Sequence, residues 1–461
     1  MDLNLYCDFL ENFNHCDVRD FEIKHPIKNL LFDHLDWLYE LDAASKLRPC
    51  VLDNIQKMLL CKTIYLGYDR FECPVCLNES IAPHSCHSRF CNSCGVKYAQ
   101  AISAKVSSFC LDVPHRHIVF TIPDSLRNWF RQDRSRLNLL FIAARNTICA
   151  IVNRSLYKKA KRKKLKNTHY LYKNYRQSNH FGMIATLHTF GRDLKWNPHI
   201  HTLVPELIFN PRNQTIKVFH HFNFVKLRNT FMFELLRLMQ DLIGPAFKKD
   251  KSTLYSKHKN GFYVYARYMS EDKEYSSEEN SKNINACISY TMRYVGRPAM
   301  AENRIIDYSK TDDTVEWFYH DHKDGKKHIV KEDAKSFIKK LLIHIPDSNF
   351  RTIRYYGFYS NKAIKELDLV HTLLGNKKKQ DYSRETRKKK KTSKLNKLKY
   401  RTYLIDTFHR DPLKCKCGNY LVFKDSYNPL EGIKNERSYR TKCLNEMQKM
   451  RIRRRSPTLG P

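Results

Sequence analysis

Two histidines separated by one apolar residue form the clearest chemical pattern in this chain. His199-Ile200-His201 lies in the run Trp196–Val204, which ends in β-branched and aliphatic residues. Side chains alternate between the two faces of a strand, so His199 and His201 should project together while Ile200 points into a core. Two imidazoles on one face can bind a divalent metal ion. The pattern therefore predicts a metal-binding histidine pair carried by a strand.

The same spacing occurs twice more, but with a charged residue in the middle. These copies are His115-Arg116-His117, which precedes an apolar strand, and His320-Asp321-His322, which leads into the hairpin-turn signal Asp324-Gly325. Surface histidines on a strand remain the alternative for any single copy. Only the copy at 199–201 keeps its middle residue apolar, and we place the metal there.

His188 is the candidate third ligand. It lies in the apolar run 181–190, which should pair as an antiparallel neighbour with the strand of His199 and His201. The alternative is a packed core histidine, and Asp193 and Glu206 are lower-ranked ligands. Two histidines with one further ligand leave positions open, which suits Mg²⁺ or Mn²⁺ holding a phosphate oxygen and water.

A pair of tyrosines downstream could supply a nucleophile. Tyr290 and Tyr294 are four residues apart, so they share one face if residues 284–295 form a helix. A metal can polarise a scissile phosphate while a tyrosine hydroxyl attacks it. Arg293 and Arg297 could offset the phosphate charge. Helix-packing tyrosines and solvated arginines are the alternatives.

Paired cysteines predict a structural zinc site near the N-terminus. Two Cys-x-x-Cys knuckles fit a four-thiolate zinc ribbon whose ligands are Cys73, Cys76, Cys91 and Cys94. Cys86 could replace one of them. Arg89 and Lys97 lie beside the knuckles and are candidate DNA contacts. A zinc staple for a small domain, without DNA contact, is the alternative.

A further cysteine pair, Cys415-Lys416-Cys417-Gly418, resembles half a metal knuckle near the C-terminus. Its spacing is shorter than Cys-x-x-Cys, and Cys443 is the only thiol after it. We therefore expect at most a degenerate zinc knuckle here.

Charge and composition favour a nucleic-acid partner. The chain has 461 residues, with 83 Lys and Arg against 47 Asp and Glu, a formal net charge of +36, and 12% aromatic residues that could stack on bases. A basic protein that binds any polyanion is the alternative. The polar start Met1-Asp2-Leu3-Asn4 and the absence of a run of ~18 apolar residues predict a cytoplasmic protein without a membrane partner. Its 15 cysteines should then be thiols or metal ligands.

Four segments follow from these patterns. We predict a helical region at 1–66, a zinc ribbon at 67–105, a catalytic domain at 106–375, and a basic linker with a C-terminal tail at 376–461. Within the catalytic domain, one long amphipathic helix is expected from Ser125 to about Tyr157.

Taken in order, these motifs resemble the rolling-circle insertion-sequence transposases with two tyrosines and an HUH motif (His, hydrophobic, His), the IS91 family. The likeness runs from about residue 55 to 423, and its most specific part is the stretch His188–His201. The other matching pieces are the ribbon Cys73–Cys94, the strand His115–Pro123, the segment Tyr290–Arg297, His344-Ile345-Pro346 with Arg354-Tyr355-Tyr356-Gly357, and Asp411-Pro412-Leu413 with its cysteines. The short Cys415-Lys416-Cys417 spacing departs from the family, which usually has Cys-x-x-Cys there.

The resemblance implies an α+β HUH-endonuclease fold, in which an antiparallel sheet with packed helices carries the histidines on a central strand after a small zinc ribbon. It also implies a transposase that nicks and joins single-stranded DNA at element ends and in target DNA through a 5′-phosphotyrosine. A plasmid or phage replication initiator or a relaxase would use the same chemistry. A zinc-ribbon DNA-binding protein without catalysis is the alternative from a different class.

Overall fold

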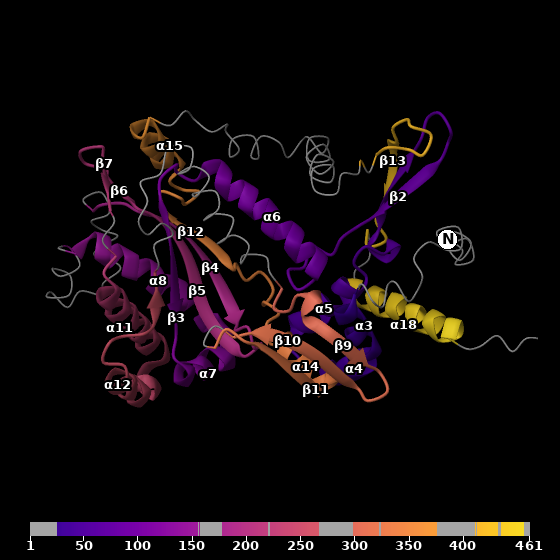
Figure 1. The fold of residues 1–461 in the computed structure, drawn as a ribbon, viewed down its shortest axis with the longest axis horizontal. Coiled ribbons are helices and arrows are strands. Elements are labelled where there is room, and N and C mark those ends of the chain that lie inside the picture. Colours follow the sequence, from indigo (N-terminus) through magenta and orange to yellow (C-terminus); the bar gives the residue numbers. More distant parts are fainter. Residues whose placement is uncertain are drawn as a thin grey trace, which may run out of the picture.

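A five-stranded antiparallel sheet forms the centre of the computed structural model (Figure 1). The structure describes residues 25–154, 156, 178–219, 222–266, 298–321, 324–375, 411, 413–431 and 435–455. The strand order is β12-β4-β5-β3-β8. Their bounds are β3 His115–Thr121, β4 Gly182–Phe190, β5 Trp196–Pro205, β8 Val264–Tyr265 and β12 Ile353–Gly357. The histidine strand β5 is therefore central, and the predicted α+β class with its antiparallel sheet is confirmed.

Helices cover both faces of this sheet because both faces carry buried apolar side chains. Ile118, Met183 and Ile200 point to one face and share a core with four helices. These helices are α7 Asp124–Gln132, α8 Leu137–Val152, α11 Phe224–Ile243 and α12 Lys248–Lys257. Ile184 and Leu203 point to the other face, toward α6 Asn92–Phe109 and α15 Ile364–Leu373.

The prediction of one long helix from Ser125 to about Tyr157 is wrong, because the chain forms two helices there, α7 and α8. Asp133 leaves the helical conformation with φ −134° and ψ 102°, and its carboxylate accepts a hydrogen bond from the Ser135 amide at 3.0 Å. This cap starts a short 3₁₀ turn, η2 Arg134–Arg136, before α8. Arg134–Val152 is the one described segment long and apolar enough to cross a membrane, but α8 packs there as a core helix against α11 and the sheet.

One glycine fixes the edge of the sheet. Gly357 ends β12 with φ 59°, and a Cβ at this position would lie 1.5 Å from the Phe181 carbonyl oxygen. Only glycine allows this conformation and this close approach of the two backbones.

A second core combines the beginning, the middle and the end of the chain. N-terminal helices pack with a three-stranded sheet, the helix α14 and the C-terminal helix α18. Their bounds are α3 Pro26–Asp33, α4 Leu35–Ala43, α5 Pro49–Leu59, β9 Ile305–Ser309, β10 Thr314–His320, β11 Lys327–Asp333, α14 Ala334–Leu342 and α18 Glu436–Arg455. The predicted boundaries at 66 and 375 stay predictions, and apolar packing joins segments on both sides of them.

Two smaller sheets complete the described chain. β6 Leu207–Asn210 and β7 Thr215–Val218 form a hairpin. β1 Tyr68–Glu72 pairs on one side with β2 Glu79–Pro83 and on the other with β13 Val422–Tyr427, so the predicted C-terminal tail supplies a strand to the predicted zinc ribbon (Figure 1).

Candidate functional site

Three histidines converge on the face of the central sheet that α6 covers. The antiparallel register pairs His188 on β4 directly with His199 on β5, as the sequence predicts. Nitrogen atoms of His188, His199 and His201 all lie within 4.8 Å of one another. Nε2 of His199 is 3.0 Å from Nε2 of His201. Ile200 points the other way into the core, where it is fully buried.

Burial keeps the rings of His199 and His201 neutral. It lowers the pKa of His199 to about 4. Burial also lowers the pKa of His201 well below its usual value, and the neighbouring His188 and His199 add to this effect. A neutral imidazole offers a nitrogen lone pair, which is the form that a metal ion requires.

Hydrogen bonds fix which nitrogen faces the cluster. His199 Nδ1 lies 2.7 Å from the Asn197 carbonyl oxygen, which can only accept, so Nδ1 donates and Nε2 carries the lone pair on the side of His201. His201 Nδ1 lies 2.9 Å from Nε2 of His117 on β3. If His201 donates through Nδ1, its Nε2 also presents a lone pair to the cluster.

His117 is the residue that the sequence analysis missed. Its ring is parallel to that of His201 within 8°, with centroids 5.1 Å apart, and burial lowers its pKa to about 4. The sequence did not favour His115 and His117 as metal ligands because the residue between them, Arg116, is charged. In the structure Arg116 forms a buried ion pair with Glu206 at 2.7 Å. That pairing satisfies the charge without exposing the strand, and the antiparallel neighbour His117 then meets His201.

A pocket opens beside His188. Its lining includes aromatic, cationic and histidine side chains together with Pro298 and Ala299, which follow the tyrosine segment in the chain. The charged, histidine and aromatic members are Arg89, Phe90, Arg134, His188, Phe190, His344, Asp347 and Phe350.

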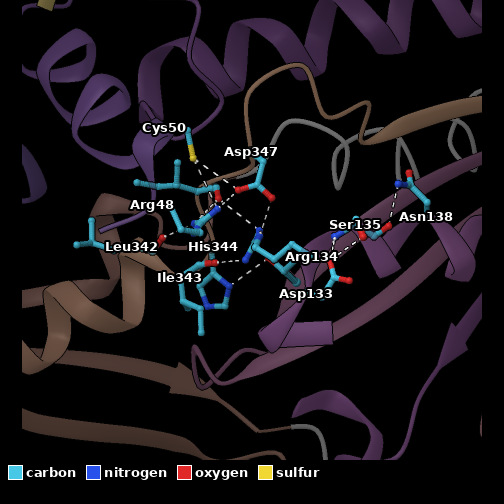
Figure 2. Close-up of polar contacts among 12 residues, drawn as sticks. Arg48, Cys50, Asp133, Arg134, Ser135, Asn138, Leu342, Ile343, His344 and Asp347 are labelled. Atoms are coloured by element: carbon cyan, nitrogen blue, oxygen red, sulfur yellow. Dashed lines mark hydrogen bonds and ion pairs between the residues drawn. The ribbon is translucent and has the colours of Figure 1, made fainter. Parts of the chain in front are cut away.

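An Arg–Asp–Arg bridge borders this pocket and links the two large cores. Figure 2 shows Arg48, at the start of α5, and Arg134, in η2, converging on Asp347. Arg134 Nε donates to Asp347 at 3.1 Å and Nη1 donates to the Ile343 carbonyl at 2.8 Å. Its guanidinium lies 4.8 Å from the centroid of the Trp196 ring, at the start of β5.

His344 also lies between the two large cores. Its Nε2 is 3.0 Å from the Leu194 carbonyl oxygen, and its Nδ1 is 3.1 Å from the Thr189 hydroxyl. The carbonyl can only accept, so Nε2 donates and Nδ1 accepts from the hydroxyl. Burial lowers the pKa of His344 to about 4.

The candidate DNA contacts on the N-terminal side of α6 have defined partners. Arg89 donates to the Tyr98 hydroxyl and lies over the Tyr98 ring at 4.3 Å from its centroid. The Lys97 side chain is exposed, but partial desolvation of its ammonium group lowers its pKa. The other candidates, Tyr290, Tyr294, Arg293 and Arg297, lie outside the described residues.

The single zinc site predicted from Cys73, Cys76, Cys91 and Cys94 is wrong, because these thiols divide between two clusters. Cys91 and Cys94, at the start of α6, lie with Cys61 and Cys86. Sγ of Cys94 is 3.5 Å from Sγ of Cys61 and 3.6 Å from Sγ of Cys86. The alternative ligand Cys86 is therefore in this first cluster, and Cys61, which follows α5, was not predicted.

Cys73 and Cys76 form the second cluster with Cys415 and Cys417. The expected degenerate knuckle near the C-terminus is thus the missing half of the N-terminal one. Cys443, the other late thiol, is buried in the core between α18 and α5.

Comparison with known proteins finds two matched regions in the chain. A family model described as "Transposase zinc-binding domain" matches residues 33–122, and one described as "Putative transposase" matches residues 182–366. The first match together with the four-cysteine clusters supports structural zinc.

Two similar proteins extend the comparison over most of the chain. The "Transposase for insertion sequence element IS801" of Pseudomonas savastanoi pv. phaseolicola is 26% identical over 341 residues, which is 73% of this chain and 77% of the relative. The "Putative transposase y4qJ" of Sinorhizobium fredii (strain NBRC 101917 / NGR234) is 26% identical over 311 residues, 66% of this chain and 73% of the relative. No solved structure matches the chain. The two domain matches, in this order, and the two relatives show that the chain belongs to the IS91 family of insertion-sequence transposases.

Proposed function

We propose that this transposase nicks and joins single-stranded DNA through a 5′-phosphotyrosine intermediate, as in rolling-circle transposition. The observation that carries the proposal is the convergence of His188, His199 and His201 on adjacent strands, with their donor atoms within 4.8 Å of one another. Three imidazoles in a fixed cluster are a metal-binding set, and a basic DNA-handling protein has a direct use for a metal beside a phosphate.

The donor set fits a divalent ion and favours Mn²⁺ over Mg²⁺. All three donors are imidazole nitrogens, whereas Mg²⁺ prefers oxygen ligands. When bound, such an ion supplies Lewis-acid polarisation of a phosphate oxygen. Asn197 and His117 hold the rings of His199 and His201 in the orientation that binding requires.

In the proposed cleavage, the hydroxyl oxygen of Tyr290 or Tyr294 attacks the scissile phosphorus. A P–O bond to tyrosine forms as the P–O3′ bond breaks, the tyrosine proton is released, and the leaving 3′ oxygen takes up a proton. Phosphodiester energy is retained, so a 3′ hydroxyl can reverse the step and join new ends without a nucleotide cofactor. The second tyrosine can cut a second strand while the first stays loaded.

Chain connectivity supports a meeting of Tyr294 with the histidines. Pro298 lines the pocket beside His188. Tyr294 is four residues before Pro298, so their Cα atoms are at most about 14 Å apart whatever the conformation between them.

The surroundings support a single-stranded DNA ligand. Arg89 and Arg134 lie with Phe190 around the pocket, and cations with aromatic rings are suited to phosphate and to unstacked bases. The formal charge of +36 adds long-range attraction. We propose that the protein acts in the bacterial cytoplasm on element ends and target DNA, with Arg293, Arg297 and Lys97 as further contacts.

A replication initiator or relaxase would share this chemistry, but both similar proteins reported above are named transposases. A zinc protein without catalysis would not need a cluster of three histidines, one of which lines a pocket.

The test is a covalent-adduct assay. Labelled single-stranded DNA spanning an element end is incubated with the protein and Mn²⁺ or Mg²⁺, and adducts are resolved on a denaturing gel. His199→Ala with His201→Ala should abolish the adduct without unfolding the protein. Tyr290→Phe with Tyr294→Phe should also abolish it, while Tyr263→Phe, an exposed tyrosine of the described chain, should not. An adduct in the double tyrosine variant would reject these nucleophiles, and cleavage in the histidine variant would reject the metal site.

A further inference from the structure

We infer that Cys73, Cys76, Cys415 and Cys417 bind a second zinc ion, which clasps the C-terminal segment onto the N-terminal zinc domain. This inference is independent of the cleavage chemistry proposed above. The matched zinc-binding domain ends at residue 122, so it holds all four thiols of the first cluster but only two of these.

The thiol geometry suits tetrahedral zinc. Sγ of Cys73 lies 3.5 Å from Sγ of Cys417, and Sγ of Cys76 lies 3.5 Å from Sγ of Cys415. All four sulfurs lie within 4.8 Å of one another. Zinc–sulfur bonds of about 2.3 Å in a tetrahedron place sulfurs about 3.8 Å apart, so small shifts would accommodate the ion.

Both loops are shaped as knuckles. The Leu77 amide donates to the Cys73 carbonyl at 2.9 Å, and Leu77 takes φ +56°. The Gly418 amide donates to the Cys415 carbonyl at 3.0 Å, and Gly418 takes φ +88°. Two tight turns that present cysteines toward each other have a ligand-binding form before any ion arrives.

Side-chain amides supply further support to the sulfurs. Asn78 Nδ2 lies 3.9 Å from Sγ of Cys415, and Asn419 Nδ2 lies 3.6 Å from Sγ of Cys417. Such donors stabilise thiolates, which are the zinc-binding form.

Apolar burial does not explain how this sheet holds together. Among the described residues its core contains only Cys73, Cys415 and Leu421, with Phe71 packed against them, and all six residues of β13 are exposed. A three-stranded sheet needs a hydrophobic face or another constraint to be stable. Metal binding contributes its free energy to folding, and here it would join segments separated by 344 residues of sequence.

The two clusters should release zinc at different rates. Cys76 and Cys417 are exposed, whereas Cys61, Cys91 and Cys94 are buried in the large N-terminal core. A chelator should therefore first remove the zinc ion bound by Cys73, Cys76, Cys415 and Cys417.

Zinc content of the full chain tests the assignment. We expect two zinc ions in the wild-type protein, one after Cys415→Ser with Cys417→Ser, and two after Cys149→Ser, a control thiol outside both clusters. One zinc in the wild type, or two in the double variant, would overturn the site.

Hydrogen exchange tests the clasping role. In the Cys415→Ser/Cys417→Ser variant, amides of β1 and β13 should exchange at least tenfold faster while those of β4 and β5 keep their protection, which also shows that the rest of the chain is folded. Loss of one zinc with unchanged exchange in β13 would overturn the clasp and leave only a bound ion.

Discussion

The two cysteine clusters have the same ligands but different surroundings. Cys61, Cys91 and Cys94 belong to a core that also contains helices α3, α4, α5 and α14, so thiols there are surrounded by apolar packing. Cys73 and Cys415 share a core with one leucine. Metal in the first cluster reinforces a structure that hydrophobic burial already favours. In the second it replaces the hydrophobic core.

The largest effect should come from breaking the buried cluster. Cys91→Ser with Cys94→Ser removes two ligands within the main N-terminal core and leaves buried hydroxyls among apolar side chains. We expect a loss of 4 kcal/mol or more, at about the upper limit for ordinary substitutions, measured by urea unfolding of the purified protein. If this variant proves no less stable than Cys415→Ser/Cys417→Ser, the contrast between the clusters is wrong.

A second prediction concerns how α18 attaches to this core. Arg440 is 2% exposed and pairs with Asp53 on α5 and with Glu436. Arg440→Ala removes a buried guanidinium, which pairs with two partly exposed acidic side chains, and a packed stem; this should cost about 3 kcal/mol of unfolding free energy. Arg437→Ala is the matched control: it pairs with Asp42 but is 42% exposed, so it should cost under about 1 kcal/mol. Equal effects would mean that α18 adds little to the core.

The contact region between the two large cores, where His344 lies, should lose stability in acid. The folded pKa of His344 is about 4, against about 6.5 in an unfolded chain. The unfolded state therefore binds the proton first, and stability present above pH 6.5 is lost as the pH falls toward 4. From His344 alone, the free energy of unfolding should be about 2 kcal/mol lower at pH 5 than at pH 8. Other buried histidines act in the same direction, so the difference between wild type and His344→Gln isolates this residue; identical pH slopes would contradict it.

The smallest expected effect concerns the cluster of His188, His199 and His201, whose ligand atoms are nitrogens rather than sulfurs. His117→Gln removes the imidazole opposite Nδ1 of His201. Orienting partners of this kind contribute about 10- to 100-fold in metal affinity, so Mn²⁺ binding measured by calorimetry should weaken by that factor. His115→Gln is the control, since His115 lies on the same strand but contacts Tyr359. Unchanged affinity in His117→Gln would show that His117 only packs.

The sequence predicts features that are local along the chain. His188, His199 and His201 lie on consecutive antiparallel strands, so strand periodicity and one turn are enough to bring them together. His117 lies 84 residues before His201, and its place depends on which strand β5 takes as its other neighbour. The cysteines follow the same rule. Each knuckle could be read from its spacing, but the pairing of Cys73 with Cys417 depends on tertiary packing that no local pattern encodes.

The core that α3, α5 and α18 share can be completed only late in synthesis. Leu444 of α18 packs into a core that residues such as Leu30 and Ile55 begin. At about 5–20 residues per second, a ribosome needs roughly 20–80 s to travel between these points. During that interval the first helices exist without their closing partner, while the histidine strands have already emerged. A message truncated after residue 375 would therefore encode every candidate catalytic residue and still leave the N-terminal core open.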